Sequence, residues 1–295
     1  MKKIALFIVC AALVRGEAAL VLQTDFGTKD GAVAAMKGVA VGVSPRLAIH
    51  DLSHENTPFD VWEAAYRLKQ TAGYWPAGTV FVSVIDPGVG TERKSVVLKT
   101  KSGHYFVGPD NGTWTLVAEE LGVEAVREID EARNRRKDSE KSYTFHGRDV
   151  YAYTGARLAA GVMTFEDVGP ELGASVVELA YEKARREDGA LIGTIPYLDF
   201  QFGNVWTNLG EKLFAELGVQ PGERLKVTIR RGGEVVYAGE MPYARTFGDV
   251  PEGAPLVYLN SLLNVSFALN MGNFAEKHGI GFGAEWSVRV EKVAR

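Results

Sequence analysis

The chain has 295 residues, of which 46% are hydrophobic, and its formal net charge is −4. This length and composition provide for a sizeable hydrophobic core in one large domain or two smaller ones. The slightly acidic balance, without a basic stripe, argues against nucleic-acid binding. The arginine-rich run over residues 133–137 is expected to be a solvated loop.

The first eighteen residues have the pattern of a secretory signal peptide. Two lysines precede an apolar run over residues 4–14 that is too short to span a bilayer. Gly16 and Ala18 then supply small residues for cleavage. We expect residues 1–18 to be removed and the protein to be exported, either periplasmic or secreted. The single cysteine, Cys10, lies in this segment, so the mature chain would have no disulfide or thiolate chemistry.

Residues 19–184 alternate predicted strands with predicted helices. This alternation predicts an N-terminal α/β domain whose sheet is mostly parallel and flanked by helices. Apolar residues at helical spacing and short β-branched runs place the elements along the chain. Expected helices cover residues 31–43, 59–72, 113–121 and 150–160, and expected strands cover the stretch from about 19 to 24 and residues 79–85, 95–99 and 105–108.

A charged segment over residues 182–189 is the predicted domain boundary. Short runs of strand-forming residues follow it, and Arg231-Gly232-Gly233 predicts a hairpin turn between two of them. Residues 190–295 are therefore expected to form a smaller, all-β, barrel-like domain. Its expected strands cover residues 191–197, 225–230, 234–237, 256–259 and 286–290.

Polar side chains follow several of the predicted strands of the first domain. Asp25 and Asp86 each end an apolar run, Arg93 comes seven residues after Asp86, and His146 lies between an aromatic residue and a glycine. Ligands of open α/β sheets bind outside the carboxyl ends of strands, so these residues predict one convergent polar site. The alternative is a set of strand-end caps and a core histidine.

These residues belong to segments that resemble the S-adenosylmethionine (SAM) hydroxide adenosyltransferase family, the adenosine-forming SAM hydrolases. That family is related to the fluorinating and chlorinating enzymes that use the same substrate. The matching segments keep the family's order from about residue 19 to about residue 275. They cover residues 24–27 with Asp30, 36–38, 51–54, 78–81, 86–93, 108–112, 145–149 and 202–208.

The resemblance implies hydrolysis of SAM to adenosine and L-methionine by attack of water or hydroxide at C5′. The sulfonium leaves as a neutral thioether, so the enzyme must chiefly position and activate the water. The implied catalytic trio is Asp86, Arg93 and His146. Asp86 would orient the water, Arg93 would hold Asp86 ionised, and His146 would complete the network and could carry the proton away. No metal or cofactor is implied.

The resemblance also implies the residues that bind the substrate. Asp25 would accept hydrogen bonds from the ribose hydroxyls. Asp30 would support the same loop, although a role at a helix N-terminus is equally open. Asn204 would contact the adenine edge and Trp206 would stack on it, unless both form a barrel corner. The remaining implied contacts are Asp199 for the methionine ammonium, with Phe145, Ser261, Ser266 and Leu269.

The C-terminal match departs from the family pattern, because Leu263 and Ser266 replace a glycine and a glutamate. This drift and the expected export leave an alternative, an exported adenosine- or nucleoside-binding protein with vestigial catalysis. A SAM-dependent halogenase is a third hypothesis, since halogenating relatives carry Tyr in place of Asp86 and fluoride-using ones carry Ser in place of Gly147. The family further implies a homotrimer with sites between subunits. Neither nucleic acid nor membrane is expected as a partner.

Overall fold

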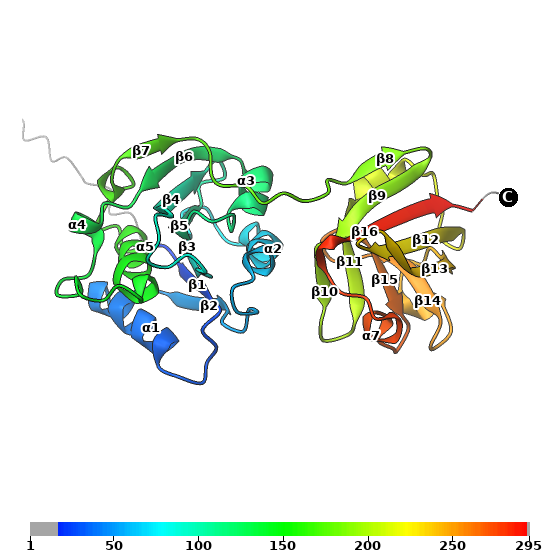
Figure 1. Cartoon of the computed structure of the whole chain (residues 1–295), viewed down its shortest axis with the longest axis horizontal. Coiled ribbons are helices and arrows are strands. Elements are labelled where there is room, and N and C mark those ends of the chain that lie inside the picture. Colours follow the sequence, from blue (N-terminus) through cyan, green and yellow to red (C-terminus); the bar gives the residue numbers. More distant parts are fainter. Residues whose placement is uncertain (1–16, 294–295) are drawn as a thin grey trace, which may run out of the picture. The chain divides into compact units, whose positions relative to one another are not determined.

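A computed structural model of the chain describes residues 17–293 (Figure 1). The expected signal peptide therefore lies outside the described residues except for its last two positions. The pattern of contacts divides the chain into two compact units. The first holds the residues up to Phe59, Gly73–Asn111 and Ala118–Val176, and the second holds Asp60–Ala72, Gly112–Val117 and the residues from Val177 onward.

The first unit is built on a seven-stranded sheet with the strand order β2-β1-β3-β5-β4-β6-β7. Strands β2, β1, β3 and β5 run parallel to one another. Strands β4, β6 and β7 extend the sheet beyond β5 with antiparallel pairs. The strands are β1 (Leu20–Thr24), β2 (Ile49–Ser53), β3 (Val80–Val84), β4 (Ser95–Thr100), β5 (Tyr105–Pro109), β6 (Val123–Glu128) and β7 (Glu171–Gly173). Strands β1 and β3 are buried along their whole length, as expected for central parallel strands.

Helices pack on this sheet and supply the rest of its core. Helix α1 (Ala32–Val43) packs against α5 (Tyr153–Ala159), and α5 contacts β1 and β3. The chain enters α5 through a π-helix over Gly147–Ala152, which replaces the first part of the α-helix predicted from residue 150. Helix α4 (Glu131–Asn134) and a 3₁₀ turn over Glu166–Val168 also belong to this unit, whereas α2 (Val61–Ala72) and the start of α3 (Thr115–Leu121) fall in the second unit.

The second unit contains two antiparallel sheets that share one hydrophobic core. One sheet has the order β10-β11-β15-β14, and the other has the order β13-β12-β16-β9-β8. Its strands are β8 (Arg185–Glu187), β9 (Ala190–Ile195), β10 (Tyr197–Asp199), β11 (Asn204–Gly210), β12 (Arg224–Arg231), β13 (Glu234–Pro242), β14 (Pro255–Leu259), β15 (Asn264–Leu269) and β16 (Gly283–Lys292). Short helices α6 (Glu211–Ala215) and α7 (Phe274–His278) and a 3₁₀ turn over Phe247–Asp249 complete it.

The predicted fold class is confirmed: a mostly parallel sheet with helices, followed by an antiparallel β region (Figure 1). The predicted hairpin at residues 231–233 joins β12 to β13. Within the charged segment predicted as a boundary, Arg185–Glu187 forms β8 and pairs with β9. The bounds 19–184 and 190–295 remain a prediction for the domains.

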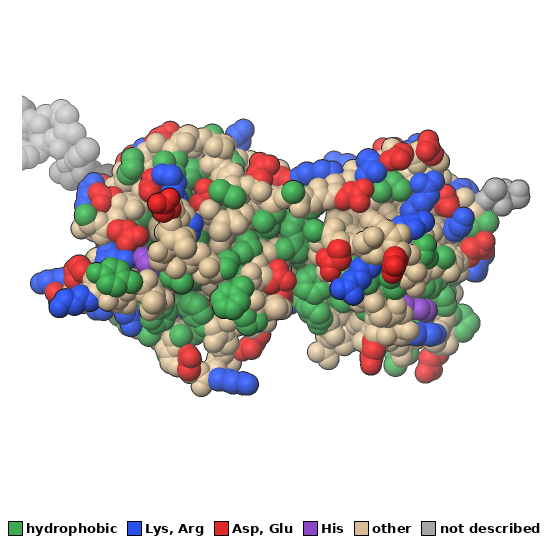
Figure 2. All heavy atoms as spheres, in the orientation of Figure 1, with side chains coloured by type: hydrophobic (Ala, Val, Ile, Leu, Met, Phe, Trp, Pro, Cys, Tyr) green, Lys and Arg blue, Asp and Glu red, His purple; other side chains and the backbone are tan. Residues whose placement is uncertain are grey.

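Charged side chains of both signs are interspersed on the visible face of each unit (Figure 2). Among residues 17–293, no helix combines the length and the apolar character needed to cross a membrane.

Candidate active site

An arginine–carboxylate pair lies at the carboxyl end of β3. Asn111 Nδ2 donates a 2.9 Å hydrogen bond to the carbonyl of Ile85, which fixes the chain just before Asp86. The loop then turns back so that Arg93 grips Asp86: Nε lies 3.0 and 3.1 Å from the two carboxylate oxygens, and Nη2 lies 2.6 Å from Oδ2. Both side chains are nearly buried, with exposures of 6% for Asp86 and 12% for Arg93. A paired, forked contact of this kind gives the carboxylate a fixed orientation.

A buried hydroxyl pair holds the other side of the Arg93 guanidinium. Arg93 Nη1 donates to Ser95 Oγ at 3.1 Å, and Ser95 Oγ lies 3.0 Å from the hydroxyl of Tyr151. Tyr151 is fully buried, and this burial raises the pKa of its hydroxyl, so Tyr151 stays a neutral phenol. Arg93 is thus braced from β4 and from the π-helix, and it has no freedom to leave Asp86.

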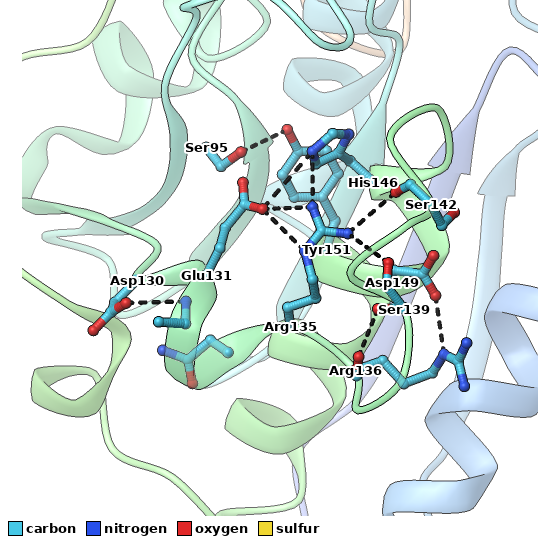
Figure 3. Close-up of polar contacts among 12 residues, drawn as sticks. Ser95, Asp130, Glu131, Arg135, Arg136, Ser139, Ser142, His146, Asp149 and Tyr151 are labelled. Carbon is cyan, nitrogen blue, oxygen red and sulfur yellow. Dashed lines mark hydrogen bonds and ion pairs between the residues drawn. The ribbon is translucent and has the colours of Figure 1, made fainter.

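His146 immediately precedes the π-helix and is buried. Its Nε2 lies 3.1 Å from Arg135 Nη2 and 3.8 Å from Glu131 Oε2 (Figure 3), whereas its Nδ1 is buried without a hydrogen-bond partner in the described structure. Burial is the main cause that lowers the pKa of His146; Glu131 opposes it, and Arg93 and Arg135 add to it. The imidazole is therefore neutral at neutral pH.

Asp25 lies at the end of β1, in a loop held by a buried polar network. Thr24 Oγ1 lies 2.9 Å from His54 Nδ1, and His54 Nε2 lies 3.0 Å from Asp51 Oδ1. Asp25 Oδ2 accepts a 2.9 Å hydrogen bond from the backbone N–H of Phe59. Burial raises the pKa of the Asp25 carboxyl, the Phe59 hydrogen bond opposes this, and the nearby charge of Asp86 raises the pKa further.

A cavity of about 260 Å³ brings several of these predicted residues together. It is lined by Asp25, Asp86, Phe145 and His146, with Phe26, Pro58, Phe59, Val84, Val89, Thr144 and Gly147. Phe26 and Phe145 meet edge to face, with ring centroids 5.8 Å apart. A Cβ atom on Gly147 would come within 3.2 Å of Val84 and 3.3 Å of Phe26, so a side chain there would press on the cavity wall.

A larger cavity of about 660 Å³ lies against other parts of the same cluster. Arg93, Ser95, Glu131, Arg135 and His146 are among the residues that line it. His146 lines both cavities, while Asp86 lines the smaller one and Arg93 the larger one. Each member of the trio predicted from the sequence therefore lines at least one of the two cavities, and only His146 lines both.

Asp30 has a structural position outside the smaller cavity. Its Oδ1 accepts a 2.8 Å hydrogen bond from the N–H of Ala32 at the start of α1, and the side chain is exposed. This is the helix-terminal position that the sequence left open as an alternative.

The remaining predicted contacts lie in the second unit. Asn204 Nδ2 donates to Asp199 Oδ2 at 3.1 Å, which joins β11 to the end of β10. Trp206 is opposite Ser266 in the register of β11 and β15. Ser266 is fully buried, Leu269 packs in the hydrophobic core, and Ser261 is exposed in the turn between β14 and β15. In the same turn Leu263 has a φ of 58°, a conformation that glycine adopts without strain.

Models of known protein families match both parts of the chain. The N-terminal domain of the SAM hydroxide adenosyltransferase family matches residues 20–169, and the C-terminal domain of that family matches residues 193–287. The chain belongs to the SAM hydroxide adenosyltransferase family. The family predicted from the sequence motifs is therefore confirmed.

Curated relatives of this chain carry two names. A protein of Methanocaldococcus jannaschii named (R)-S-adenosyl-L-methionine hydrolase is 49% identical over 47% of this chain, and the match spans 52% of that protein. A protein of Thermus thermophilus with the same name is 36% identical over 88% of this chain and 95% of its own length. A fluorinase of Nocardia brasiliensis is 30% identical over 92% of this chain and 96% of its own. The prediction that the chain is an enzyme of this family is confirmed.

Solved structures share the fold. An uncharacterized conserved protein from Thermotoga maritima superposes with a TM-score of 0.85 at 36% identity, covering 92% of this chain and all 100% of the other. A conserved hypothetical protein from Thermus thermophilus gives a TM-score of 0.70 at 32% identity, covering 92% and 99%. Each match covers residues of both units.

The expectation of a solvated loop at residues 133–137 holds for Arg133 and Lys137, which are exposed, and is wrong for the three residues between them. Asn134 is buried, Arg135 binds Glu131 and His146, and Arg136 Nε donates to the buried Asp149 at 2.9 Å. Although burial raises it, hydrogen bonds from Arg148, Arg136 and Ser142 bring the pKa of Asp149 down to about 2. Two arginines of the run thus have carboxylate partners: Arg135 pairs with the part-exposed Glu131, and Arg136 pairs with the buried Asp149. The one signal in the sequence is the four-residue spacing of Glu131 and Arg135, which places them on one helix face.

Among residues 17–293, no group of three or more His, Cys, Asp or Glu side chains is arranged to hold a metal ion. The groups on the cavity walls are a fixed carboxylate, a fixed guanidinium and a neutral imidazole. Such a set can bind and polarise a small neutral molecule such as water next to an apolar, partly aromatic wall.

Proposed function

We propose that the protein hydrolyses S-adenosyl-L-methionine to adenosine and L-methionine by attack of water at C5′. The observation that carries the proposal is the Asp86–Arg93 pair at the edge of the cavity that Asp25 and His146 also line. A carboxylate at this position suits water, whereas it would repel a halide. The relatives named as hydrolases of (R)-S-adenosyl-L-methionine support the same substrate class.

The chemistry needs few protein groups. Water forms the new C5′–O bond while the C5′–S bond breaks. The electron pair of the C5′–S bond goes to sulfur, so methionine leaves as a neutral thioether. One water proton must pass to a base, and of the two carboxylates on the cavity wall, Asp25 and Asp86, the proposal assigns this role to Asp86, which Arg93 orients. In the proposal, Arg93 fixes Asp86 and Asp25 accepts hydrogen bonds from the ribose. Neither a metal nor an organic cofactor takes part.

The proposed contacts with the ends of the substrate come from the second unit. Asn204, Trp206 and Asp199 supply an amide, an indole face and a carboxylate, the groups suited to adenine and to an ammonium. Ser261, Ser266 and Leu269 stay proposed contacts through the turn and strand that carry them, as does Phe145 on the wall of the smaller cavity.

The test is an incubation of purified protein with both sulfonium epimers of SAM in ¹⁸O-enriched water. We expect adenosine and methionine in equal amounts, with ¹⁸O on the 5′-oxygen of adenosine. Parallel reactions contain chloride or fluoride. A 5′-halogenated nucleoside would establish the halogenase alternative. Tight adenosine binding without turnover of either epimer would favour the binding-protein alternative. The departures from the family pattern at Leu263 and Ser266 are the observation that supports this alternative.

We also propose that the enzyme works as a homotrimer, as the family resemblance implies. Sedimentation at several protein concentrations measures the assembly. A monomer that retains full turnover would contradict this proposal.

Export is proposed from the lysines and the apolar run before residue 15. Glu17 Oε1 accepts a 2.6 Å hydrogen bond from Ser44 Oγ, and the expected removal of residues 1–18 would take this contact away. N-terminal sequencing of the native protein gives the answer, and an intact Met1 would contradict export.

A further inference from the structure

The ring of His146 has two nitrogens with different surroundings. Nε2 faces Arg135 at 3.1 Å (Figure 3), and an arginine side chain has only donors. Nε2 of a neutral imidazole must therefore be the acceptor in this pair, which leaves the ring proton on Nδ1. Nδ1 is the nitrogen that is buried without a partner in the described structure.

Arg135 is held in place by contacts other than the one to His146. Its Nε and Nη2 donate to Glu131 Oε2 at 3.2 and 2.6 Å. Its Nη1 lies 3.4 Å from the carbonyl of Ser139 and 3.2 Å from that of Ser142. Two backbone carbonyls thus orient the guanidinium independently of the glutamate (Figure 3). The side chain has an exposure of only 12%.

We propose that Arg135 is a positioning residue that holds His146 in its Nδ1–H tautomer, so that His146 offers a hydrogen-bond donor, and not a base, to the reacting water. This inference rests on the proposed function. Arg135 and Glu131 line the larger cavity and not the smaller one, so Nε2 is committed to that side. His146 lines the smaller cavity as well, and Nδ1–H is the ring group for which the described structure supplies no acceptor.

The consequence for the reaction is a division of roles. Nδ1–H donates to the oxygen of the water and fixes it, while Asp86 accepts the proton that the water loses on attacking C5′. His146 in this tautomer has no free lone pair with which to take the proton. The role of proton carrier that the family resemblance suggested for His146 is therefore replaced by that of a donor.

The charged groups that face His146 influence its protonation and its tautomer. Glu131 and Arg135 come from α4 and the residue after it, Asp86 and Arg93 come from the loop after β3, and the Tyr151 ring from the π-helix lies 6.4 Å away. Glu131 and Arg135 compete for Nε2. Glu131 Oε2, 3.8 Å from Nε2, would accept a proton from it if Arg135 were absent. Removal of Arg135 is thus expected to move the ring proton from Nδ1 to Nε2.

Two substitutions separate the tautomer from the ion pair, because both break the Arg135–Glu131 contact. Arg135→Met keeps the length of the side chain but removes all donors, and it should shift the tautomer. Glu131→Gln leaves Arg135 hydrogen-bonded to the carbonyls of Ser139 and Ser142, so this variant should keep the wild-type tautomer. Arg135→Lys restores a single donor and should recover part of the Nδ1–H form. Arg136→Gln removes the neighbouring arginine, which pairs with Asp149, and serves as the control.

The experiment is ¹⁵N NMR of the ring nitrogens in protein labelled at its five histidines, with His146 assigned by its loss in His146→Asn. We expect a protonated Nδ1 in the wild type, in Glu131→Gln and in Arg136→Gln, and a protonated Nε2 in Arg135→Met. In parallel, kcat of Arg135→Met should fall on the order of tenfold with little change in KM, less than the loss of a donor outright.

Two results would overturn the inference. One is a wild-type His146 protonated on Nε2. The other is an equal loss of activity in Arg135→Met and Glu131→Gln without a change of tautomer, which would mean that the pair only supports the fold. The NMR measurement needs no substrate. A protein with the expected tautomers that does not hydrolyse SAM would therefore refute the proposed function and leave the tautomer assignment standing.

Discussion

The polar residues at and near the strand ends of the first unit are held differently from those on β10, β11 and β15 of the second unit. At the strand ends, Asp86, Arg93 and His146 are held by partners that leave one face open to a cavity. In the second unit, Asp199 and Asn204 bond to each other, and Ser266 is buried with its hydroxyl on the carbonyl of Asn264. The reacting groups are thus held in place, while Asp199, Asn204 and Ser266 already make hydrogen bonds within the unit and Trp206 Nε1 is buried without a partner in the described structure.

The difference suggests a division of labour: the loop of Asp86 and Arg93 determines the reaction, and the second unit determines which substrate binds. The Asp86–Arg93 pair depends on one loop of fixed geometry, so a single substitution there removes the chemistry. The β14–β15 turn has accepted Leu263 at a φ of 58° and still closes, because Asn260 Oδ1 accepts from the N–H groups of Leu262 and Asn264 at 2.9 and 3.1 Å. We expect substitutions in the two regions to affect different measurements.

The largest effect should come from the trio. Asp86→Ala, Arg93→Ala and His146→Ala should each lower kcat on the order of a hundredfold or more, because each removes a group that positions or activates the water. The losses should not add in the double variants, since the residues act as a unit. Adenosine affinity, measured by calorimetry, should stay close to that of the wild type. Hydrolysis at the wild-type rate in both Asp86→Ala and His146→Ala would show that the machinery lies elsewhere.

Asp25→Ala should weaken adenosine binding and should not act on the chemical step itself. The lost ribose contact is present in both the ground state and the transition state, so adenosine should bind about tenfold to a hundredfold more weakly, as expected for hydrogen bonds to a charged group. Calorimetric titration with adenosine measures this, and Asp30→Ala is the matched control, because Asp30 caps α1. Equal losses in the two variants would argue against a special role for Asp25.

A smaller effect is expected in the pH profile of kcat. Burial first, and then Arg93 and Arg135, lower the pKa of His146, while Glu131 and Asp86 raise it. The neutral imidazole should persist as the pH falls below the ordinary histidine value of 6.5, and the acid limb of the profile should lie below it. Glu131→Gln removes a group that raises the pKa and should move the limb to lower pH, whereas Arg135→Met should move it to higher pH. Shifts of the opposite sign would contradict the assignment of this limb to His146.

The smallest effect concerns stability in the second unit. Leu263→Gly should relieve left-handed strain and raise the free energy of unfolding by up to about 1 kcal/mol. Denaturant unfolding measures the change, and Leu262→Gly, one residue earlier in the same turn, should not stabilise. No gain for Leu263→Gly would mean that the exposed leucine side chain makes compensating contacts.

Much of the first unit could be predicted from the sequence because its strands are short, buried and β-branched. Those patterns placed Asp25 and Asp86 at strand ends, and the structure puts both on one cavity wall. The family motifs, not periodicity, singled out His146 and Arg93. Short or amphipathic elements such as β6 and α4 have too few residues in a regular hydrophobic pattern to be predicted from the sequence. Their secondary structure depends on tertiary contacts.

The partners of His146 could not be predicted for a related reason. Arg135 lies in a run whose composition is typical of a solvated surface, and only the fold brings it against a buried imidazole. The π-helix is equally hidden, because the sequence of residues 147–152 is typical of an ordinary α-helical start. In the second unit, the hydrogen bond between Asp199 and Asn204 follows from strand register, which a single sequence does not specify.

The wide turn after His146 has a consequence for how this family can change. A π-turn holds one more residue than an α-turn and arises in a helix from a single insertion. Deleting one residue within Gly147–Ala152 would let the segment wind as an α-helix continuous with α5, whose core-facing residues would keep their places. The residues before it would rotate by about 100° around the helix axis, the angle of one α-helical step. A change of one residue in length would thus carry His146 off the cavity wall while the scaffold stays intact.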